Sequence, residues 1–226
     1  MSTLPRPLKW PPIFPQDNGL VAWYPFDDRS GAVLRDRSGK GNHGTLYGPT
    51  WVAGQRGSAL SFDGINDYLT IPDIPIFSLA SSWSFCYWMK TTDSNIDVLI
   101  KYVGGNLILF RIFGDGRYEN YVSDGAHVVD LVTTGAVNDG VWRFHVLTYD
   151  IVAKTLLYYQ NGILEKSGDT TAINLHAMSA TTVVGRGDLS GGWLEAIIGE
   201  VRIYNRALSA AETKRHAESE LMLVRS

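Results

Sequence analysis

Short apolar runs separated by turn-forming residues recur along this chain and predict β-strands. The clearest set lies in residues 138–168, where the runs 141–150 and 155–160 are rich in aromatic and β-branched residues. Asn161-Gly162 follows the second run, and this dipeptide is typical of a type I′ hairpin turn because both positions need a positive φ. The segment therefore predicts three consecutive antiparallel strands.

The same pattern extends over most of the chain and predicts an all-β domain at residues 18–208. Regularly spaced short strands with turns between them favour a two-sheet sandwich over βαβ units. Residues 209–226 are expected to form a C-terminal helix and tail, because Ser209 and Glu212 make a capping box before a run of good helix formers. We expect the remaining strands at 19–26, 59–62, 68–71, 83–90, 98–102, 107–113, 118–122, 128–133, 181–184, 194–198 and 201–204.

The composition agrees with a folded domain and limits the classes of partner. Hydrophobic residues make up 45% of the 226 residues and charged residues 19%, which is enough apolar material for a core. The net charge of -3 gives no electrostatic case for binding nucleic acid. No apolar run approaches the roughly 20 residues that span a bilayer. Cys86 is the single cysteine, so no intrachain disulfide forms, and its alternating apolar surroundings predict a buried thiol.

Residues 1–17 form a proline-rich arm that is expected to be extended. Prolines stand where the apolar stretch of a signal peptide would be. The sequence therefore predicts a protein that is made in the cytoplasm and stays there, or leaves by lysis or within an assembly. Trp10, Ile13 and Phe14 lie between the prolines, and we expect them to dock on the domain itself or on another protein chain of an assembly.

A set of segments in a fixed order along residues 19–215 carries a family resemblance. They are 20–27, 36–44, 60–69, 83–90, 142–146, 159–162 and 200–209. Together they resemble the laminin-G-like, concanavalin A-like jelly-roll domains. The resemblance implies two antiparallel sheets of roughly six or seven strands each, packed face to face. It leaves the function open, since this fold serves lectins, glycanases, adhesion modules and capsid or tail parts.

Glycan hydrolysis on this fold would need two carboxylates on one sheet face, about 5 to 5.5 Å apart for a retaining mechanism. The nearest match is Glu195 and Glu200, with Ile197 between them. Because these acids are five residues apart, we expect them on opposite faces of a strand unless a bulge intervenes. The histidines show no metal-ligand spacing, and His145 is expected to pack or to form a hydrogen bond. No catalytic residue is therefore predicted.

Acidic loops offer a candidate site for a structural calcium ion. Asp27 and Asp36 lie in early loops, Asp63 and Asn66 lie in one tight loop, and calcium prefers such oxygen ligands. In the resembling family an acid is common just before the glutamate of the last strand, but Gly199 holds that position here. In the alternative interpretation these four residues are turn residues that bond their own backbone. No other cofactor is predicted.

A glycan site would combine exposed aromatic rings, which stack on sugars, with polar side chains that hold hydroxyl groups. Four tryptophans are expected in the core instead, namely Trp23, Trp83, Trp88 and Trp142. The candidates for ligand binding are Tyr102, Asn106, Arg117, Tyr118, Tyr121 and Trp193.

Two classes of function remain. The first is a non-catalytic interaction or structural module, a surface, decoration or adhesion component of a larger assembly such as a virion, with glycans as further ligands. The second is a calcium-dependent carbohydrate-binding lectin. A glycoside hydrolase is a third, and it would need an acid pair other than the one that the sequence offers.

Overall fold

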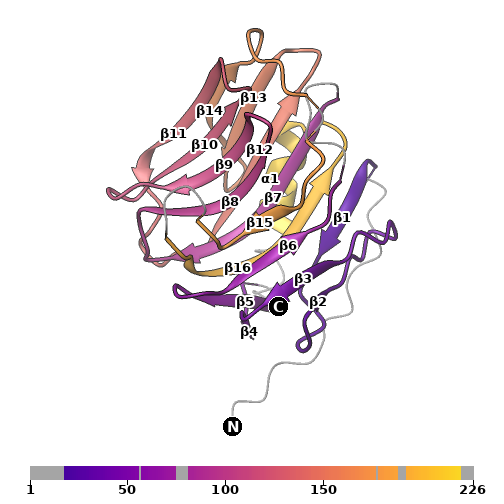
Figure 1. Ribbon diagram of the computed structural model, residues 1–226, viewed down its shortest axis with the longest axis vertical. Coiled ribbons are helices and arrows are strands. Elements are labelled where there is room, and N and C mark those ends of the chain that lie inside the picture. The colour runs from indigo at the N-terminus through magenta and orange to yellow at the C-terminus, as the bar shows by residue number, and fades with distance from the viewer. Residues whose placement is uncertain (1–17, 56, 75–80, 177, 188–191, 220–226) are drawn as a thin grey trace.

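The computed structural model describes residues 18–55, 57–74, 81–176, 178–187 and 192–219, which form a two-layer β-sandwich with one helix (Figure 1). The predicted arm, with Trp10, Ile13 and Phe14, lies outside the described residues. The helix is α1 (Ala210–Ser219). The strands are β1 (Leu20–Tyr24), β2 (Val33–Leu34), β3 (Gly44–Tyr47), β4 (Thr50–Ala53), β5 (Ser58–Asp63), β6 (Tyr68–Ile71), β7 (Trp83–Thr91), β8 (Ile96–Val103), β9 (Asn106–Ile112), β10 (Arg117–Ser123), β11 (Val128–Ala136), β12 (Arg143–Asp150), β13 (Thr155–Gln160), β14 (Ile163–Asp169), β15 (Thr182–Val184) and β16 (Glu195–Tyr204).

Each sheet contains eight strands within the described part of the chain. The first sheet runs in the order β14-β13-β12-β7-β16-β5-β4, and β1 also pairs with β16. The second sheet runs in the order β11-β10-β9-β8-β15-β6-β3-β2. The predicted antiparallel sandwich is confirmed, but each sheet is larger than the expected six or seven strands. The sequence pattern missed β2, β3 and β4, because each has only two to four residues and lies among glycines, prolines and other turn formers.

The segment 138–168 forms the three consecutive antiparallel strands that its pattern predicts. β12 pairs with β13, and β13 pairs with β14. Asn161 and Gly162 join the last two with φ values of 52° and 79°. Both angles are positive, as a type I′ turn requires.

β16 is one strand where two were predicted, and it holds the centre of the first sheet. Its register with β7 shifts between Ile198 and Val201, so Gly199 and Glu200 together face one residue of β7. This bulge reverses the alternation of side chains along the second half of the strand. The first half of β16 pairs with β5 and the second half with β1.

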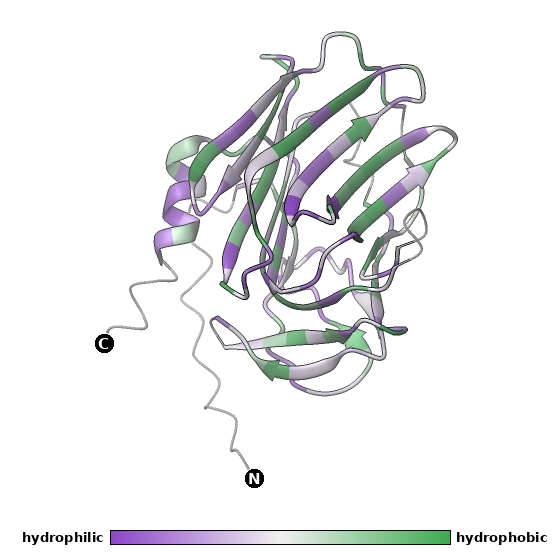
Figure 2. Ribbon diagram, turned by 90° about the vertical axis from the view of Figure 1, so that its left-hand side faces the viewer, coloured by the Kyte–Doolittle hydropathy of each residue, from purple (hydrophilic) through white to green (hydrophobic). Residues whose placement is uncertain are grey.

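Apolar side chains are buried in two layers. The larger layer fills the space between the sheets and includes Trp83. The second layer covers the outer face of the first sheet, beneath α1, and includes Trp23 of β1 and Trp88 of β7, with Trp142 partly buried against it. Figure 2 shows α1 on the outside of the sandwich. The expectation that these four tryptophans serve the core is confirmed.

The predicted helix and the predicted buried groups are also confirmed. The capping box forms, since Ser209 N–H donates to Glu212 Oε2 at 2.9 Å and Glu212 N–H donates to Ser209 Oγ at 3.3 Å. Cys86 is buried, and burial raises the pKa of its thiol. His145 is buried between the sheets, with its Nδ1 2.8 Å from the Tyr158 hydroxyl.

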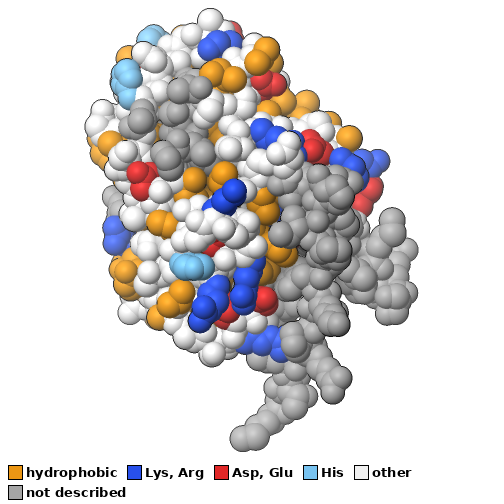
Figure 3. Space-filling view, turned by 90° about the vertical axis from the view of Figure 1, so that its right-hand side faces the viewer, with side chains coloured by type: hydrophobic (Ala, Val, Ile, Leu, Met, Phe, Trp, Pro, Cys, Tyr) orange, Lys and Arg blue, Asp and Glu red, His pale blue; other side chains and the backbone are white. Residues whose placement is uncertain are grey.

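Charged side chains of both signs are mixed on the surface. On the face shown in Figure 3, basic side chains lie beside acidic ones rather than forming one continuous field. Arg37 illustrates this pattern, because its Nη2 lies 3.0 Å from Asp27 Oδ1 and 2.9 Å from Asp28 Oδ1. Within the described residues, no helix has the length and apolar character needed to cross a membrane.

Candidate functional site

Two tyrosines lie side by side on the outer face of the second sheet. β3 and β6 pair with Tyr47 opposite Tyr68, and the adjacent Leu46 and Leu69 are buried between the sheets. Because side chains alternate along a strand, both tyrosines point outward. Their rings stack with centroids 4.3 Å apart and an angle of 6° between the planes.

Trp193 and Arg186 extend this pair of rings. They come from the connection between β15 and β16, where they form an isolated antiparallel bridge. The Trp193 ring lies 6.2 Å from the Tyr68 ring, centroid to centroid, and Arg186 Cζ lies 5.2 Å from the Tyr68 centroid. We call Tyr47, Tyr68 and Trp193 the aromatic ladder. Segments far apart in the sequence thus join in one aromatic surface with a cation on it.

Tyr47 is the most open ring of the aromatic ladder, with 44% of the residue exposed, whereas the other two rings are half-buried. Beyond Tyr47 lies the short edge strand β2. Leu46 N–H donates to Ala32 O at 2.8 Å, so the antiparallel register brings Gly31 level with Tyr47. A methyl group added at Gly31 would meet no atom within 4 Å. The surface beside Tyr47 is therefore open to a ligand.

A tight turn holds Tyr47 and Tyr68 in place. Gly48 follows Tyr47 with a φ of +95°, and a Cβ there would lie 1.9 Å from Asp67 Oδ1. Asp67 precedes Tyr68, is 5% exposed, and accepts a hydrogen bond from Asp63 N–H at 3.0 Å. Burial, and then the charge of Asp63, raise the pKa of the Asp67 carboxyl. Glycine is the residue that fits at position 48, so the aromatic ladder rests on a backbone with little freedom.

The residues that the sequence proposed for sugar binding fall into two groups. Trp193 belongs to the aromatic ladder, whereas the other five lie on β8, β9 and β10. Of these five, Tyr102 is 57% exposed, and Arg117 pairs with Asp115 at 2.7 Å. Tyr121 is half-buried, and Asn106 is buried with its Nδ2 donating to the Val103 carbonyl.

The prediction that Tyr118 binds a ligand is wrong, because Tyr118 is 0% exposed and cannot contact a ligand at the surface. Its hydroxyl shares a hydrogen bond with the Tyr87 hydroxyl between the two sheets. Tyr118 and Tyr121 are three residues apart on β10, and so they point to opposite faces. Tyr47 and Tyr68 were missed as ligand residues, although the alternation of their strands places both opposite to buried leucines.

The residues proposed to bind calcium are mostly occupied with their own loops. Asp63 Oδ1 accepts hydrogen bonds from Ile65 N–H and Asn66 N–H, and Asp27 pairs with Arg37. Across the described ranges, no three His, Cys, Asp or Glu side chains come together as a metal-binding group. The turn-residue interpretation therefore describes Asp63, while Asp27 serves an ion pair.

Asp36 organises the early loop in the same way. Its carboxylate accepts hydrogen bonds from the backbone N–H groups of Trp23, Ser38 and Asn42 at 2.8 to 2.9 Å, and from the Ser38 hydroxyl at 2.8 Å. Burial raises the pKa of this carboxyl, but these hydrogen bonds outweigh burial and lower the pKa overall. Both carboxylate oxygens already accept hydrogen bonds, so Asp36 acts as a structural residue.

Glu195 and Glu200 do not form a catalytic pair. The sequence placed them on opposite faces unless a bulge intervened, and the β16 bulge does intervene, so both point toward the outer face of the first sheet. Glu200 is 8% exposed there, accepts a hydrogen bond from Trp23 Nε1 at 2.5 Å, and pairs with Arg202 at 2.7 Å. Glu195 is exposed. Glu200 is therefore engaged by Trp23 and Arg202, and the two acids cannot act together on one bond.

The family model that matches this sequence describes the concanavalin A-like lectin/glucanases superfamily and covers residues 63–214. The chain belongs to this superfamily. The resemblance carried by the sequence segments is thereby confirmed. No curated protein sequence matches the chain.

Several solved structures of binding domains and of an arabinanase domain resemble this chain. Domain 4 of AbnA, a GH43 extracellular arabinanase from Geobacillus stearothermophilus, in complex with arabinotriose, is 20% identical at a TM-score of 0.73, over 88% of this chain and 98% of that one. The binding domain of Paraclostridial Mosquitocidal Protein 1 is 16% identical at a TM-score of 0.73, over 90% of this chain and 52% of that one. The botulinum neurotoxin serotype D binding domain is 18% identical at a TM-score of 0.73, over 91% of this chain and 53% of that one. The chain spans about half the length of the two toxin domains. At these identities the likeness concerns the fold.

Proposed function

We propose that this domain is a non-catalytic carbohydrate-binding module and that its glycan ligand stacks on the aromatic ladder. The observation that carries the proposal is the surface of three neighbouring rings, of which Tyr47 is open beside Gly31, just before the edge strand β2. Sugar rings present apolar C–H faces to aromatic side chains, and their hydroxyl groups need polar partners. The Arg186 guanidinium over Tyr68 and the tyrosine hydroxyls are such partners.

Two further facts support a binding function. The superfamily is named for its lectins and glucanases, and the paired acids that would favour the second group are not found at Glu195 and Glu200. Domain 4 of AbnA, which this chain matches over nearly its whole length, is in complex with arabinotriose. An oligosaccharide is therefore the ligand class that we propose for this domain.

The test is a glycan array followed by titration calorimetry with the strongest hit, on the wild type and on Tyr47→Ala and Trp193→Ala. Each variant is expected to weaken binding by about tenfold or more, because each removes a stacking ring. Tyr102→Ala is the matched control: it removes another exposed tyrosine, on β8, and should leave binding unchanged. Binding that survives in both ladder variants, or a silent array, would overturn the proposal.

The calcium-dependent alternative is tested in the same experiment by adding a chelator. Because Asp36 and Asp63 already accept hydrogen bonds from their loops, we expect binding that does not depend on calcium. Loss of binding with the chelator and its return with calcium would favour a calcium-dependent lectin instead. The roles as a virion component or an adhesion module are finer proposals, which rest on the N-terminal arm and are tested separately below.

A further inference from the structure

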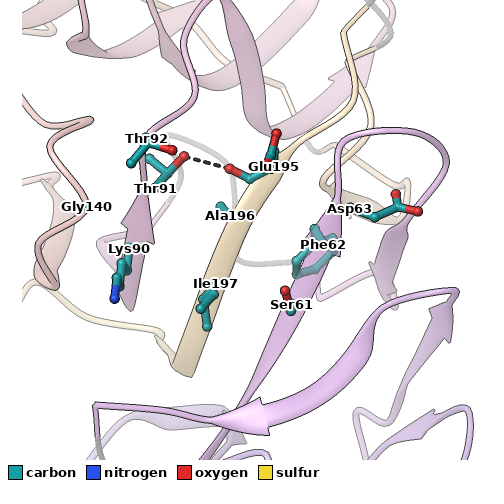
Figure 4. A pocket seen from close by; sticks show the side chains of 10 residues that line it. All are labelled: Ser61, Phe62, Asp63, Lys90, Thr91, Thr92, Gly140, Glu195, Ala196 and Ile197. Carbon is teal, nitrogen blue, oxygen red and sulfur yellow. Dashed lines mark hydrogen bonds between the residues drawn. The ribbon is translucent and has the colours of Figure 1, made fainter.

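A pocket of about 340 Å³ opens on the outer face of the first sheet, away from the aromatic ladder's sheet (Figure 4). Its size lies at the lower end of the range for small-molecule sites. β5, β16 and β7 lie side by side beneath it, and the turn at Gly140 forms one wall. The lining residues that matter here are Ser61, Asp63, Lys90, Thr92, Glu195 and Ile197.

Two acidic residues border one end of the pocket, and Figure 4 shows the Asp63 carboxylate directed away from Glu195. Asp63 and Glu195 face each other directly in the antiparallel pair of β5 and β16. Like charges in this position repel and destabilise the sheet unless a cation lies between or beside them. Asp63 uses Oδ1 for two backbone N–H groups of its turn, and the Glu195 carboxylate forms no hydrogen bond or ion pair with any described residue. This end of the pocket is therefore suited to an ammonium group.

A cation occupies the other end. Lys90 faces Ile197 across β7 and β16, so it is the diagonal neighbour of Glu195, at about 7–8 Å between backbones. A lysine side chain can bridge that distance, yet Lys90 forms no ion pair with Glu195 or with another described residue. Figure 4 shows the Lys90 ammonium group directed away from the Glu195 carboxylate. Opposite charges thus line one pocket without neutralising each other.

The middle of the pocket is apolar and held in place. Ile197 lines the pocket directly opposite Lys90, two residues along β16 from Glu195. Thr91 Oγ1 donates to the Glu195 carbonyl at 2.6 Å, and Gly140 N–H donates to the Thr91 carbonyl at 2.9 Å. These bonds tie β7, β16 and the wall together. A ligand that matches this pocket would carry an ammonium group, an apolar spacer and a carboxylate, in that order from Glu195 to Lys90.

We propose that this pocket binds an ω-amino acid, a zwitterion whose ammonium and carboxylate are separated by several methylene groups. The ammonium group pairs with Glu195, the methylene chain lies beside Ile197, and the carboxylate pairs with Lys90. Free ω-amino acids and the C-terminal lysine of a peptide share this chemistry. The site is distinct from the aromatic ladder and does not depend on glycan binding.

The probe is 6-aminohexanoate, titrated at low ionic strength because salt screens exposed ion pairs. Hexanoate and hexylamine each carry one of its two charges. We expect the zwitterion to bind at least tenfold more tightly than either analogue. Peptides distinguish the natural source: if it is a peptide, a peptide that ends in lysine binds more tightly than the same peptide with a C-terminal amide. Equal binding of the three small molecules, or no saturable binding, would overturn the proposal on the wild type alone.

Variants then locate the site. Glu195→Gln and Lys90→Met are each expected to lower the affinity at least tenfold. Glu165→Gln and Lys40→Met are the matched controls. They change the same side-chain types at exposed positions that do not line the pocket, and should leave the affinity for 6-aminohexanoate unchanged. Tyr47→Ala should also bind 6-aminohexanoate normally, which separates this site from the glycan site. Unaltered affinity in both pocket variants contradicts the assignment, and thermal unfolding checks that each variant is folded.

Discussion

Single tyrosines of this protein have different roles, and burial separates them. Tyr118 is 0% exposed and shares a hydrogen bond with Tyr87, whereas Tyr47 is 44% exposed and stacks on Tyr68. The residue type is the same, and the face of the strand to which each tyrosine points determines whether it is buried or exposed. An outward tyrosine keeps a ring face for a ligand, while an inward one must satisfy its hydroxyl within the core.

His145 gives the clearest prediction at this scale. It is buried, and burial followed by the nearby charge of Arg143 lowers its pKa from 6.5 to about 3. In the unfolded chain the ring gains a proton below about pH 6.5, whereas in the folded chain it stays neutral down to about pH 3. The contribution of His145 to the free energy of unfolding is therefore complete above pH 6.5 and declines by up to about 1.4 kcal/mol per pH unit below it.

Urea unfolding of the wild type and of His145→Gln at pH 7.5, 6.0 and 5.0 would measure this effect. The difference in unfolding free energy between the two proteins should shrink as the pH falls, because glutamine does not titrate. A difference that stays constant across the three pH values would contradict a low pKa for His145.

Among the elements, the hairpin of β13 and β14 is fastened to α1 through its turn. A Cβ at Gly162 would lie 2.6 Å from the Cα of Lys214 in the helix. Asn161 supports the same turn, since its Oδ1 accepts a hydrogen bond from Phe144 N–H at 2.9 Å. The turn therefore needs glycine for two reasons, its positive φ of 79° and the close approach of the helix backbone.

Gly162→Ala and Gly104→Ala separate these two reasons. Gly104 also has a positive φ, of 55°, but a Cβ there meets no atom within 4 Å. We expect Gly104→Ala to cost roughly 1–2 kcal/mol of unfolding free energy and Gly162→Ala to cost about 1–3 kcal/mol more, because a packed backbone must move. Chemical unfolding measures both, and equal losses would show that the contact with α1 carries no energy.

At the scale of the whole molecule, the two sheets present different outer faces. The first sheet is covered by α1 over one part and forms the charged pocket over another. The second sheet carries the aromatic ladder. The two binding surfaces that we propose therefore lie on different sheets of the sandwich.

The assembly role predicted for residues 1–17 belongs to this scale and stays a prediction. Deletion of these residues is expected to lower the oligomeric state, because it removes Trp10, Ile13 and Phe14, which we expect to dock on a neighbouring chain. Size-exclusion chromatography with light scattering measures the mass of both proteins. The same number of chains per particle before and after the deletion would count against an assembly contact in trans.

The amino-acid sequence alone determined the class of fold and several local structures. Alternating apolar positions and turn formers predicted most strands, Asn161-Gly162 predicted its hairpin, and Ser209 with Glu212 predicted the start of α1. These features depend on neighbours in the chain, whose preferences act over a few residues. The family resemblance was also readable, because turns and core aromatics recur in a fixed order.

Only the tertiary structure decided which residues share a surface. The bulge at Gly199 and Glu200 reversed the expected faces of β16, and a shift of one residue has this effect on every later side chain. Tyr47 stacks on Tyr68 because β3 pairs with β6, and Trp193 contacts Tyr68 from the distant connection between β15 and β16. Such contacts depend on strand order and register, which long-range packing sets and local sequence does not.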